Sequence, residues 1–176
     1  MSDSTFVRRT GDQALAMLGD LTDLYLDVRS QGTYRDDPLF SRAQFMARTE
    51  DQARRPGFEL VTVHADHALA GFSFGLPFSS GRWWAGAEYP PDNILEAAKF
   101  AVIELDVGRA HQGRGLGKAL LGELLSGRSE KNATLAAIPE SAAHAMYERW
   151  GWRKVGIIGG EGPMMDAMVL ALPVTR

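Results

Sequence analysis

The chain has 176 residues, a formal net charge of −3 at pH 7 and no cysteine. This length is enough for one domain with a sizeable core, and we expect a single domain over residues 1–176. The small negative charge argues against a nucleic-acid partner, and the lack of cysteine excludes disulfides, thiolate metal sites and a cysteine nucleophile. Because no signal-peptide core or membrane-length apolar stretch is present, we expect a cytoplasmic protein without a membrane partner.

The first part of the chain predicts a short edge strand followed by two helices. The strand is expected over residues 5–9. Apolar residues at near-helical spacing predict a helix over residues 13–29, capped by Asp12. A polar, turn-rich segment follows, and a second helix is expected over residues 41–54, with Ser41 as its cap.

An antiparallel hairpin is the next predicted element. Its strands cover residues 58–63 and 68–74, and residues 65–67 form the turn. His64 and His67 lie close together in this region, which raises a metal site as an alternative. Because no cysteine or carboxylate triad accompanies them, we interpret them as turn histidines and predict no metal site.

A loop of about twenty residues at 77–98 separates the hairpin from the next strand, and loops of that length are often functional. Residues 93–99 are expected to form a helical turn. An apolar strand is then predicted over residues 100–107. After the turn at residues 112–117 a helix begins, in which Leu116, Ala119, Leu120 and Leu124 form one apolar stripe.

The glycine-rich turn has the chemistry of an anion site. Glycines leave room for a ligand and tolerate positive φ, and the first N–H groups of a helix have no partners inside it. Arg109, Arg114 and Lys118 add positive charge beside the helix N-terminus. Together these features favour phosphate as the ligand. The alternative is a tight strand-to-helix turn with no ligand.

Three phosphate-binding patterns can be compared with this turn. The Rossmann pattern fails because Lys118 occupies the position of its third glycine. The Walker pattern fails because Gln112 replaces its first glycine and Ala119 replaces its Ser/Thr. The pattern Q/R-x-x-G-x-G/A fits fully, with Gln112, Gly115 and Gly117.

The remaining elements complete an order of strands and helices. A strand is expected over residues 132–138, a helix from the segment 139–141 through residue 149, and strands over residues 152–158 and 165–172. Two further motifs lie before and after this turn in the sequence. An L-x-V ends the strand over residues 100–107, and Y-x-x-x-G-[FW] starts at Tyr147. With these motifs the chain resembles the GNAT superfamily of acyl-CoA N-acyltransferases from about residue 100 to residue 155.

The resemblance implies an α/β (α+β) fold: a mixed, mostly antiparallel sheet of six to seven strands flanked by helices. It implies transfer of an acetyl group from acetyl-CoA to a small-molecule or peptide amine by direct attack in a ternary complex, without a metal. A homodimer is expected only because of the resemblance to this family. The implied residues for binding coenzyme A are Leu105, Val107, Gln112, Gly113, Arg114, Gly115, Leu116, Gly117 and Lys118.

The resemblance also suggests catalytic roles. Tyr147 is the candidate acid for the leaving thiolate, with a packing role as the alternative. Glu104 is the candidate base, although alternation along the strand turns it away from Ile103, and a structural or substrate-orienting role is the alternative. Asp106, on the same face, is the second candidate. A backbone N–H near Val107 is the expected oxyanion donor.

The segment before Tyr147 departs from the family at one position. Glu140 stands where the family often has asparagine, so Ser141 is the expected helix cap instead, and His144 is interpreted as a surface histidine. Trp83 and Trp84 are candidates for binding the acceptor, with Tyr34 as a weaker one; alternatively, a tryptophan only pins the loop. A non-catalytic acyl-CoA sensor is the main alternative function, and an acyl-CoA hydrolase or a nucleotide-binding protein is a third possibility.

Overall fold

The computed structural model describes residues 4–32 and 35–173. The chain forms two compact units, Met1–Leu76 with Glu104–Ser126 and Pro77–Ile103 with Gly127–Arg176. In the described residues, hydrogen bonding joins seven strands in the order β1-β2-β3-β4-β5-β7-β6, and β4 contributes residues to both units. This mixed sheet with flanking helices confirms the predicted fold class. A single domain over residues 1–176 stays a prediction.

The strands of the first unit are antiparallel neighbours. β1 (Ser4–Arg9) pairs with β2 (Glu59–Ala65), and β2 pairs with β3 (Ala68–Phe78). The turn between β2 and β3 consists of Asp66 and His67, whose φ angles of 50° and 66° are both left-handed. Two consecutive left-handed residues match the right-handed twist of the flanking strands. The predicted hairpin is therefore confirmed, but Ala65 belongs to β2 and not to the turn, and of the two histidines only His67 lies in the turn, since His64 also belongs to β2.

The helices of this unit begin where polar side chains accept N–H groups. The predicted single helix over residues 13–29 is instead two helices, α1 (Gly11–Ala16) and α2 (Leu18–Arg29), which are separated at Met17. Thr10, not Asp12, caps α1: its side chain accepts from the Gln13 N–H, and the Gln13 side chain accepts from the Thr10 N–H. This is a capping box, which satisfies two N–H donors reciprocally.

The third helix of the first unit confirms the predicted cap. A short 3-10 turn, η1 (Pro38–Phe40), precedes α3 (Arg42–Ala53). The Ser41 hydroxyl accepts from the Gln44 N–H, as expected for an N-cap. One face of α3 is buried through Phe45, Thr49 and Ala53.

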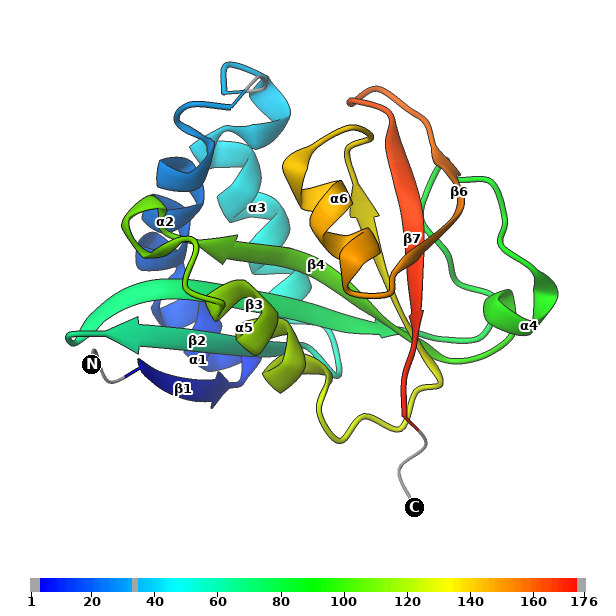
Figure 1. The fold of residues 1–176 in the computed structure, drawn as a ribbon, viewed down its shortest axis with the longest axis horizontal. Helices are drawn as coiled ribbons and strands as arrows, with labels where there is room; N and C mark the ends of the chain where they lie inside the picture. Colours follow the sequence, from blue (N-terminus) through cyan, green and yellow to red (C-terminus); the bar gives the residue numbers. More distant parts are fainter. Residues whose placement is uncertain (1–3, 33–34, 174–176) are drawn as a thin grey trace. The chain divides into compact units, whose positions relative to one another are not determined.

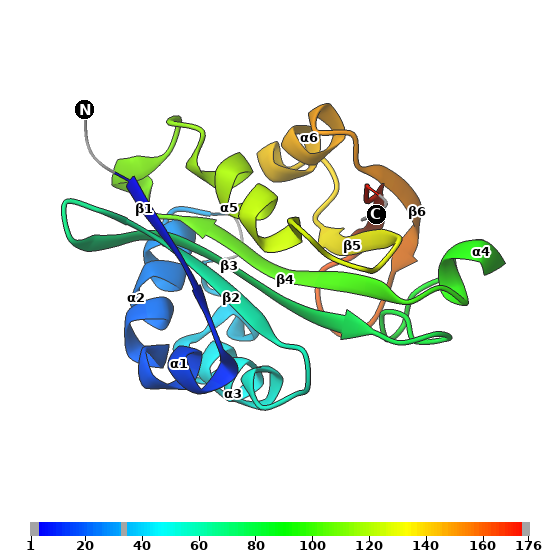
Figure 2. The same ribbon diagram turned by 90° about the horizontal axis from the view of Figure 1, so that it is seen from below.

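Helices cover both faces of the strands in the first unit (Figure 2), with α1, α2 and α3 on one face and α5 (Leu116–Leu125) on the other. Beneath α2 and α3, the Tyr25 and Phe45 rings stack at 4.0 Å, and Phe45 lies 6.5 Å from Phe72. α5 buries four leucines, Leu116, Leu120, Leu121 and Leu124. Ala119 is exposed, so its predicted place in the apolar stripe is wrong.

The second unit contains the start of β4 (Lys99–Val107) and three more strands. Residues Lys99, Phe100 and Ala101 pair in parallel with β5 (Asn132–Ala137). β7 (Met165–Ala171) pairs antiparallel with both β5 and β6 (Arg153–Ile158). The helix α6 (Ala142–Arg149) lies beside β7 (Figure 1).

The predicted loop over residues 77–98 is more structured than expected. β3 continues to Phe78, and a short helix, α4 (Asp92–Leu95), interrupts the loop. The helical turn was expected over residues 93–99, but Lys99 already belongs to β4. Within residues 4–32 and 35–173, none of the helices combines the length and apolar character needed to cross a bilayer.

Candidate active site

The phosphate turn, defined here as residues 112–118, follows β4 through a short 3-10 turn, η2 (Arg109–His111). Gln112 is extended, and Gly113 and Gly115 have φ angles of 76° and 78°. Such left-handed angles are readily adopted by glycine and are costly for other residues. They reverse the chain tightly, so that α5 starts at Leu116 directly behind the turn.

The turn leaves open space where a ligand would approach. A Cβ built on Gly113 or Gly115 meets no heavy atom of the described residues within 4 Å. Among the described residues, no side chain accepts a hydrogen bond from the first N–H groups of α5, and the N-cap residue is Gly115 itself. Arg114 and Lys118 are both exposed. The turn therefore combines backbone donors, a helix N-terminus and two cations around an open space, which suits a phosphate group.

The flanks of the turn are tied to the first unit. The Gln112 amide donates to the Val107 carbonyl at 3.0 Å, which closes the segment between β4 and the turn. Arg109 does not act as a free cation beside the turn. Its backbone N–H donates to the Asp27 carboxylate at 3.1 Å, and its guanidinium donates to the Ser30 hydroxyl at 3.0 Å. Arg114 and Lys118 are thus the cations of the predicted set that fit an anion.

Glu104 and Asp106 lie two residues apart on β4 and therefore share a face of the strand. Both meet the guanidinium of Arg29 at the end of α2. The Nη2 group of Arg29 donates to Glu104 Oε2 at 3.1 Å, and its Nη1 group donates to Asp106 Oδ1 at 2.9 Å. From α3, Arg48 Nη2 lies 3.9 Å from Glu104 Oε1. Glu104 is thus held in an ion-pair cluster, as the structural alternative in the sequence analysis expected.

Burial changes the charge states that this cluster favours. Burial raises the pKa of Glu104 to about 7, opposed by Arg29 and Arg48 and reinforced by the neighbouring Asp106. Burial also raises the pKa of Asp106, and Arg29 opposes that rise. A carboxyl that titrates near neutral pH is suited to general base catalysis. The ion pairs fit a structural role for Glu104, the raised pKa fits a general base, and both roles stay predictions.

The cations and the aromatic ring of this cluster were not predicted from the sequence. Arg29 lies over the Tyr25 ring at 3.6 Å, and Arg48 donates to the Tyr25 hydroxyl at 2.7 Å. Desolvation by burial raises the pKa of Tyr25 to about 12. One signal was available: two acidic residues on one face of an apolar strand require cationic partners if that face is covered.

In the second unit, Tyr147 lies on α6 among aromatic rings. Its ring is buried and meets Trp150 and Trp152, each at a centroid distance of 6.0 Å. The Y-x-x-x-G-[FW] motif thus forms a small aromatic cluster. The catalytic role of Tyr147 stays a prediction.

The start of α6 confirms the cap expected at Ser141 and corrects the expectation for His144. Glu140 has a left-handed φ of 63°, and the Ser141 hydroxyl next to it caps the helix by accepting from the His144 N–H at 3.0 Å. His144 is not a surface histidine, because only 12% of its side chain is exposed. Its Nε2 lies 2.9 Å from Asp166 Oδ2, which ties α6 to β7.

The two tryptophans are anchored within the second unit. Trp83 is 8% exposed, and its indole N–H donates to the Glu88 carbonyl at 3.1 Å. The indole N–H of Trp84 donates to the Thr134 hydroxyl at 3.0 Å. These contacts fit the pinning interpretation, and acceptor binding by Trp83 or Trp84 stays a prediction. Tyr34, the weaker candidate, lies outside the described residues.

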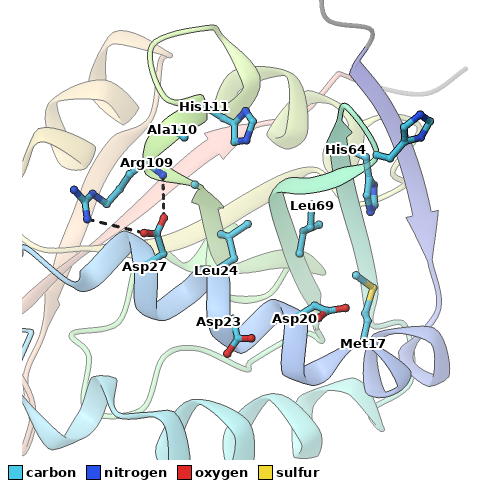
Figure 3. A pocket seen from close by; sticks show the side chains of 12 residues that line it. Met17, Asp20, Asp23, Leu24, Asp27, His64, Leu69, Arg109, Ala110 and His111 are labelled. Carbon is cyan, nitrogen blue, oxygen red and sulfur yellow. Dashed lines mark hydrogen bonds and ion pairs between the residues drawn. The ribbon is translucent and has the colours of Figure 1, made fainter.

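A pocket of about 520 Å³ opens elsewhere in the first unit, beside α2 (Figure 3). Acidic residues and histidines line it, namely Asp20, Asp23, Asp27, His64, His67 and His111. Arg109 already binds Asp27. Within the described part of the chain, no group of three or more His, Cys, Asp or Glu side chains is arranged to hold a metal ion. His111, which also lines the pocket, directly precedes the phosphate turn in the sequence.

Known proteins provide an independent comparison. The family model described as "Acetyltransferase (GNAT) family" matches residues 21–152. A GCN5-like protein acetyltransferase of Mycobacterium tuberculosis is 32% identical over 102 residues, which cover 49% of this chain and 49% of that protein. The match thus spans about half the length of the curated relative.

Solved structures share the fold at low identity. The first is a histone acetyltransferase HPA2 and related acetyltransferase from Corynebacterium glutamicum, with a TM-score of 0.66 and 18% identity over 100% of this chain and 99% of that one. The second is the PaiA N-acetyltransferase from Thermoplasma acidophilum in complex with coenzyme A, with a TM-score of 0.59 and 13% identity over 96% and 99%. At these identities the likeness shows the fold alone.

Proposed function

Because the chain belongs to the acetyltransferase (GNAT) family, we propose that it transfers an acetyl group from acetyl-CoA to a primary amine within a ternary complex. The family uses acetyl-CoA and acts on amine acceptors in general. The observation that carries the proposal is the phosphate turn: two left-handed glycines with open space beside them precede an uncapped helix N-terminus. These features are those that a pyrophosphate requires.

In this proposal each part of the turn has a task. The backbone N–H groups from Gly113 to Lys118 bind phosphate oxygens, and the side chains of Arg114 and Lys118 neutralise charge. The Gln112 amide holds the turn against the end of β4 through the Val107 carbonyl. The β4 residues Leu105 and Val107 lie beside the pantetheine arm, a role that comes from the family resemblance.

The proposed reaction conserves atoms and charge. The acceptor ammonium loses a proton, with Glu104 as the proposed base, and the electron pair stays on nitrogen. The nitrogen then forms a C–N bond with the acetyl carbonyl carbon while the C–S bond breaks, and it releases its second proton, which replaces the proton that Tyr147 gives to the thiolate. A backbone N–H near Val107 is the proposed donor to the carbonyl oxygen, and Tyr147 is the proposed acid for the departing thiolate. Positioning of the two substrates supplies a large share of the rate enhancement.

The test of this function measures binding and turnover separately. Isothermal titration with coenzyme A is expected to show one site per chain. A panel of small amines, polyamines, amino acids and peptides, scored by thiol release from acetyl-CoA, is expected to identify an acceptor class. Binding of acetyl-CoA without transfer to any amine in the panel would favour the non-catalytic sensor. Absence of binding would contradict both functions.

A further inference from the structure

The two carboxylates of β4 share one guanidinium, and this arrangement points to a joint role. We propose that Glu104 and Asp106 act as one acid pair, in which Arg29 and Asp106 are positioning residues that orient Glu104 and set its charge for accepting the proton of the amine. The proposal rests on the proposed function, because it assigns these residues to the same reaction.

Arg29 bridges the pair with two different nitrogens. Nη1 donates to Asp106 Oδ1 at 2.9 Å, and Nη2 donates to Glu104 Oε2 at 3.1 Å. The guanidinium is itself fixed, because Nη1 also donates to the Tyr25 carbonyl at 3.3 Å and the Tyr25 ring lies 3.6 Å below it. A planar group with several donors suits such bridging, and a lysine ammonium would not reproduce its geometry.

The surroundings of the pair contain few other charged or titratable groups. From α2 these are Tyr25 and Arg29, and from α3 the only contributor in the described residues is Arg48, 3.9 Å from Glu104 Oε1. Arg48 is held by the Tyr25 hydroxyl at 2.7 Å and by the Leu39 carbonyl at 2.7 Å. Two guanidiniums thus face two carboxylates, so that a proton gained by one carboxylate changes the field at the other.

The two carboxylates differ in access to solvent and in hydrogen bonding. Asp106 is 3% exposed, and its buried Oδ2 has no hydrogen-bond partner among the described residues. Glu104 is 12% exposed. The Ser73 hydroxyl fixes the backbone at Glu104 by donating to its carbonyl at 2.8 Å. Glu104 is therefore the member that can exchange a proton with a bound molecule, and Asp106 is the member that sets the field from the interior.

The test is a titration of Glu104 itself in the whole protein. Glutamate carrying ¹³C at its side-chain carboxyl is incorporated, and the Glu104 signal is assigned by its loss in Glu104→Gln. Asp106→Asn removes the neighbouring negative charge and is expected to move the Glu104 midpoint to lower pH. Arg29→Gln removes a stabilising positive charge and is expected to move it to higher pH, each by about 1 unit or more. Arg42→Gln, at an exposed arginine that pairs with Asp23, is the control and should leave the midpoint unchanged.

Opposite shifts in the two variants support the pair, and an unchanged Glu104 midpoint in both overturns it. If Arg29→Gln does not fold, Arg29→Lys replaces it: a lysine keeps the charge but cannot bridge both carboxylates, so the Glu104 midpoint should still move to higher pH. An unchanged midpoint in Arg29→Lys, or a move to lower pH, would overturn the proposal.

The activity readout separates this proposal from the proposed function. The acid limb of kcat/KM, measured with the acceptor found in the amine panel, should move in the same direction as the NMR midpoint in each variant. If the midpoints shift but Glu104→Gln keeps the wild-type acid limb, the role of the pair in proton transfer is overturned while acetyl transfer stands. If no variant and no wild-type protein transfers acetyl groups, the proposed function fails, whatever the titration shows.

Discussion

Gly115 offers a direct test of the acetyl-CoA site, because a substitution there changes the ligand space without a steric clash inside the protein. A Cβ at this position meets no heavy atom of the described residues within 4 Å, so the cost to the fold is confined to the backbone. The φ angle of 78° lies in the left-handed region, which costs a residue with a side chain about 1–2 kcal/mol. In a protein of this size, each kcal/mol lowers the Tm by about 2–4 °C.

The variant Gly115→Glu places a carboxylate where the pyrophosphate is proposed to bind. In the wild type, acetyl-CoA at a hundred times its Kd should add about 2.7 kcal/mol of stability, a rise in Tm of about 5–11 °C. In Gly115→Glu this rise should disappear, because the new side chain fills the ligand space and repels the phosphates. The assay is thermal unfolding with and without acetyl-CoA, with isothermal titration as the direct measure of affinity.

Gly127 provides a matched control outside the phosphate turn. Its φ of 72° is also left-handed, and a Cβ built there meets no heavy atom of the described residues within 4 Å. Gly127→Glu should therefore carry a similar backbone cost and keep the rise in Tm on adding acetyl-CoA. An unchanged affinity in Gly115→Glu would refute the phosphate turn as the binding site. Equal loss of binding in both variants would mean that the backbone cost of the glutamate, and not the filled ligand space, abolishes binding.

Three further predictions concern other parts of the chain. Tyr147→Phe, which keeps the ring, should lower kcat at least ~10-fold and leave the KM for acetyl-CoA nearly unchanged; steady-state kinetics with normal turnover would contradict the assigned acid. Trp84→Ala should raise the KM for the acceptor more than the KM for acetyl-CoA. Trp83→Ala removes a buried ring and should mainly lower the free energy of unfolding, by about 3–5 kcal/mol. Leu120→Ala, in the core beneath α5, should cost about 2–5 kcal/mol in denaturant unfolding, against a much smaller change for the exposed Leu39→Ala.

Most predictions from a local structural signal were accurate, with the cap of α1 as the exception, because Thr10 and not Asp12 forms it. The hairpin was predicted from two apolar runs around a short turn, and the caps Ser41 and Ser141 were predicted from side chains that serve their own helix ends. The glycine-rich turn before α5 was predicted from glycine spacing, and the left-handed φ angles of Gly113 and Gly115 agree with it, while phosphate binding there stays a prediction. Each of these signals lies within a few residues of the structure it specifies.

Predictions from the sequence were wrong where distant segments contact the predicted element. The helix predicted over residues 13–29 is divided at Met17 into α1 and α2, and α1 packs closely against α3. A Cβ on Gly11 would lie 1.9 Å from the Ala53 carbonyl oxygen, so glycine is required at this contact. The periodicity of residues 13–29 contains no information about α3. For the same reason His144 was placed on the surface, whereas its partner Asp166 lies 22 positions away on β7.

Glu104 shows how much the alternation of side chains along a strand can predict. The sequence indicated that Glu104 and Asp106 share a face and that Ile103 lies on the other one, but not which face the helices cover. Its principal partner, Arg29, lies 75 positions away, and only the packing of α2 against the sheet brings the two together. A buried ion cluster of this kind is weak evidence for stability, because the desolvation of its charges opposes their attraction. The chemistry that it permits, a carboxyl titrating near neutral pH beside a second carboxyl that adjusts it, is therefore the stronger physical reason to test these residues first.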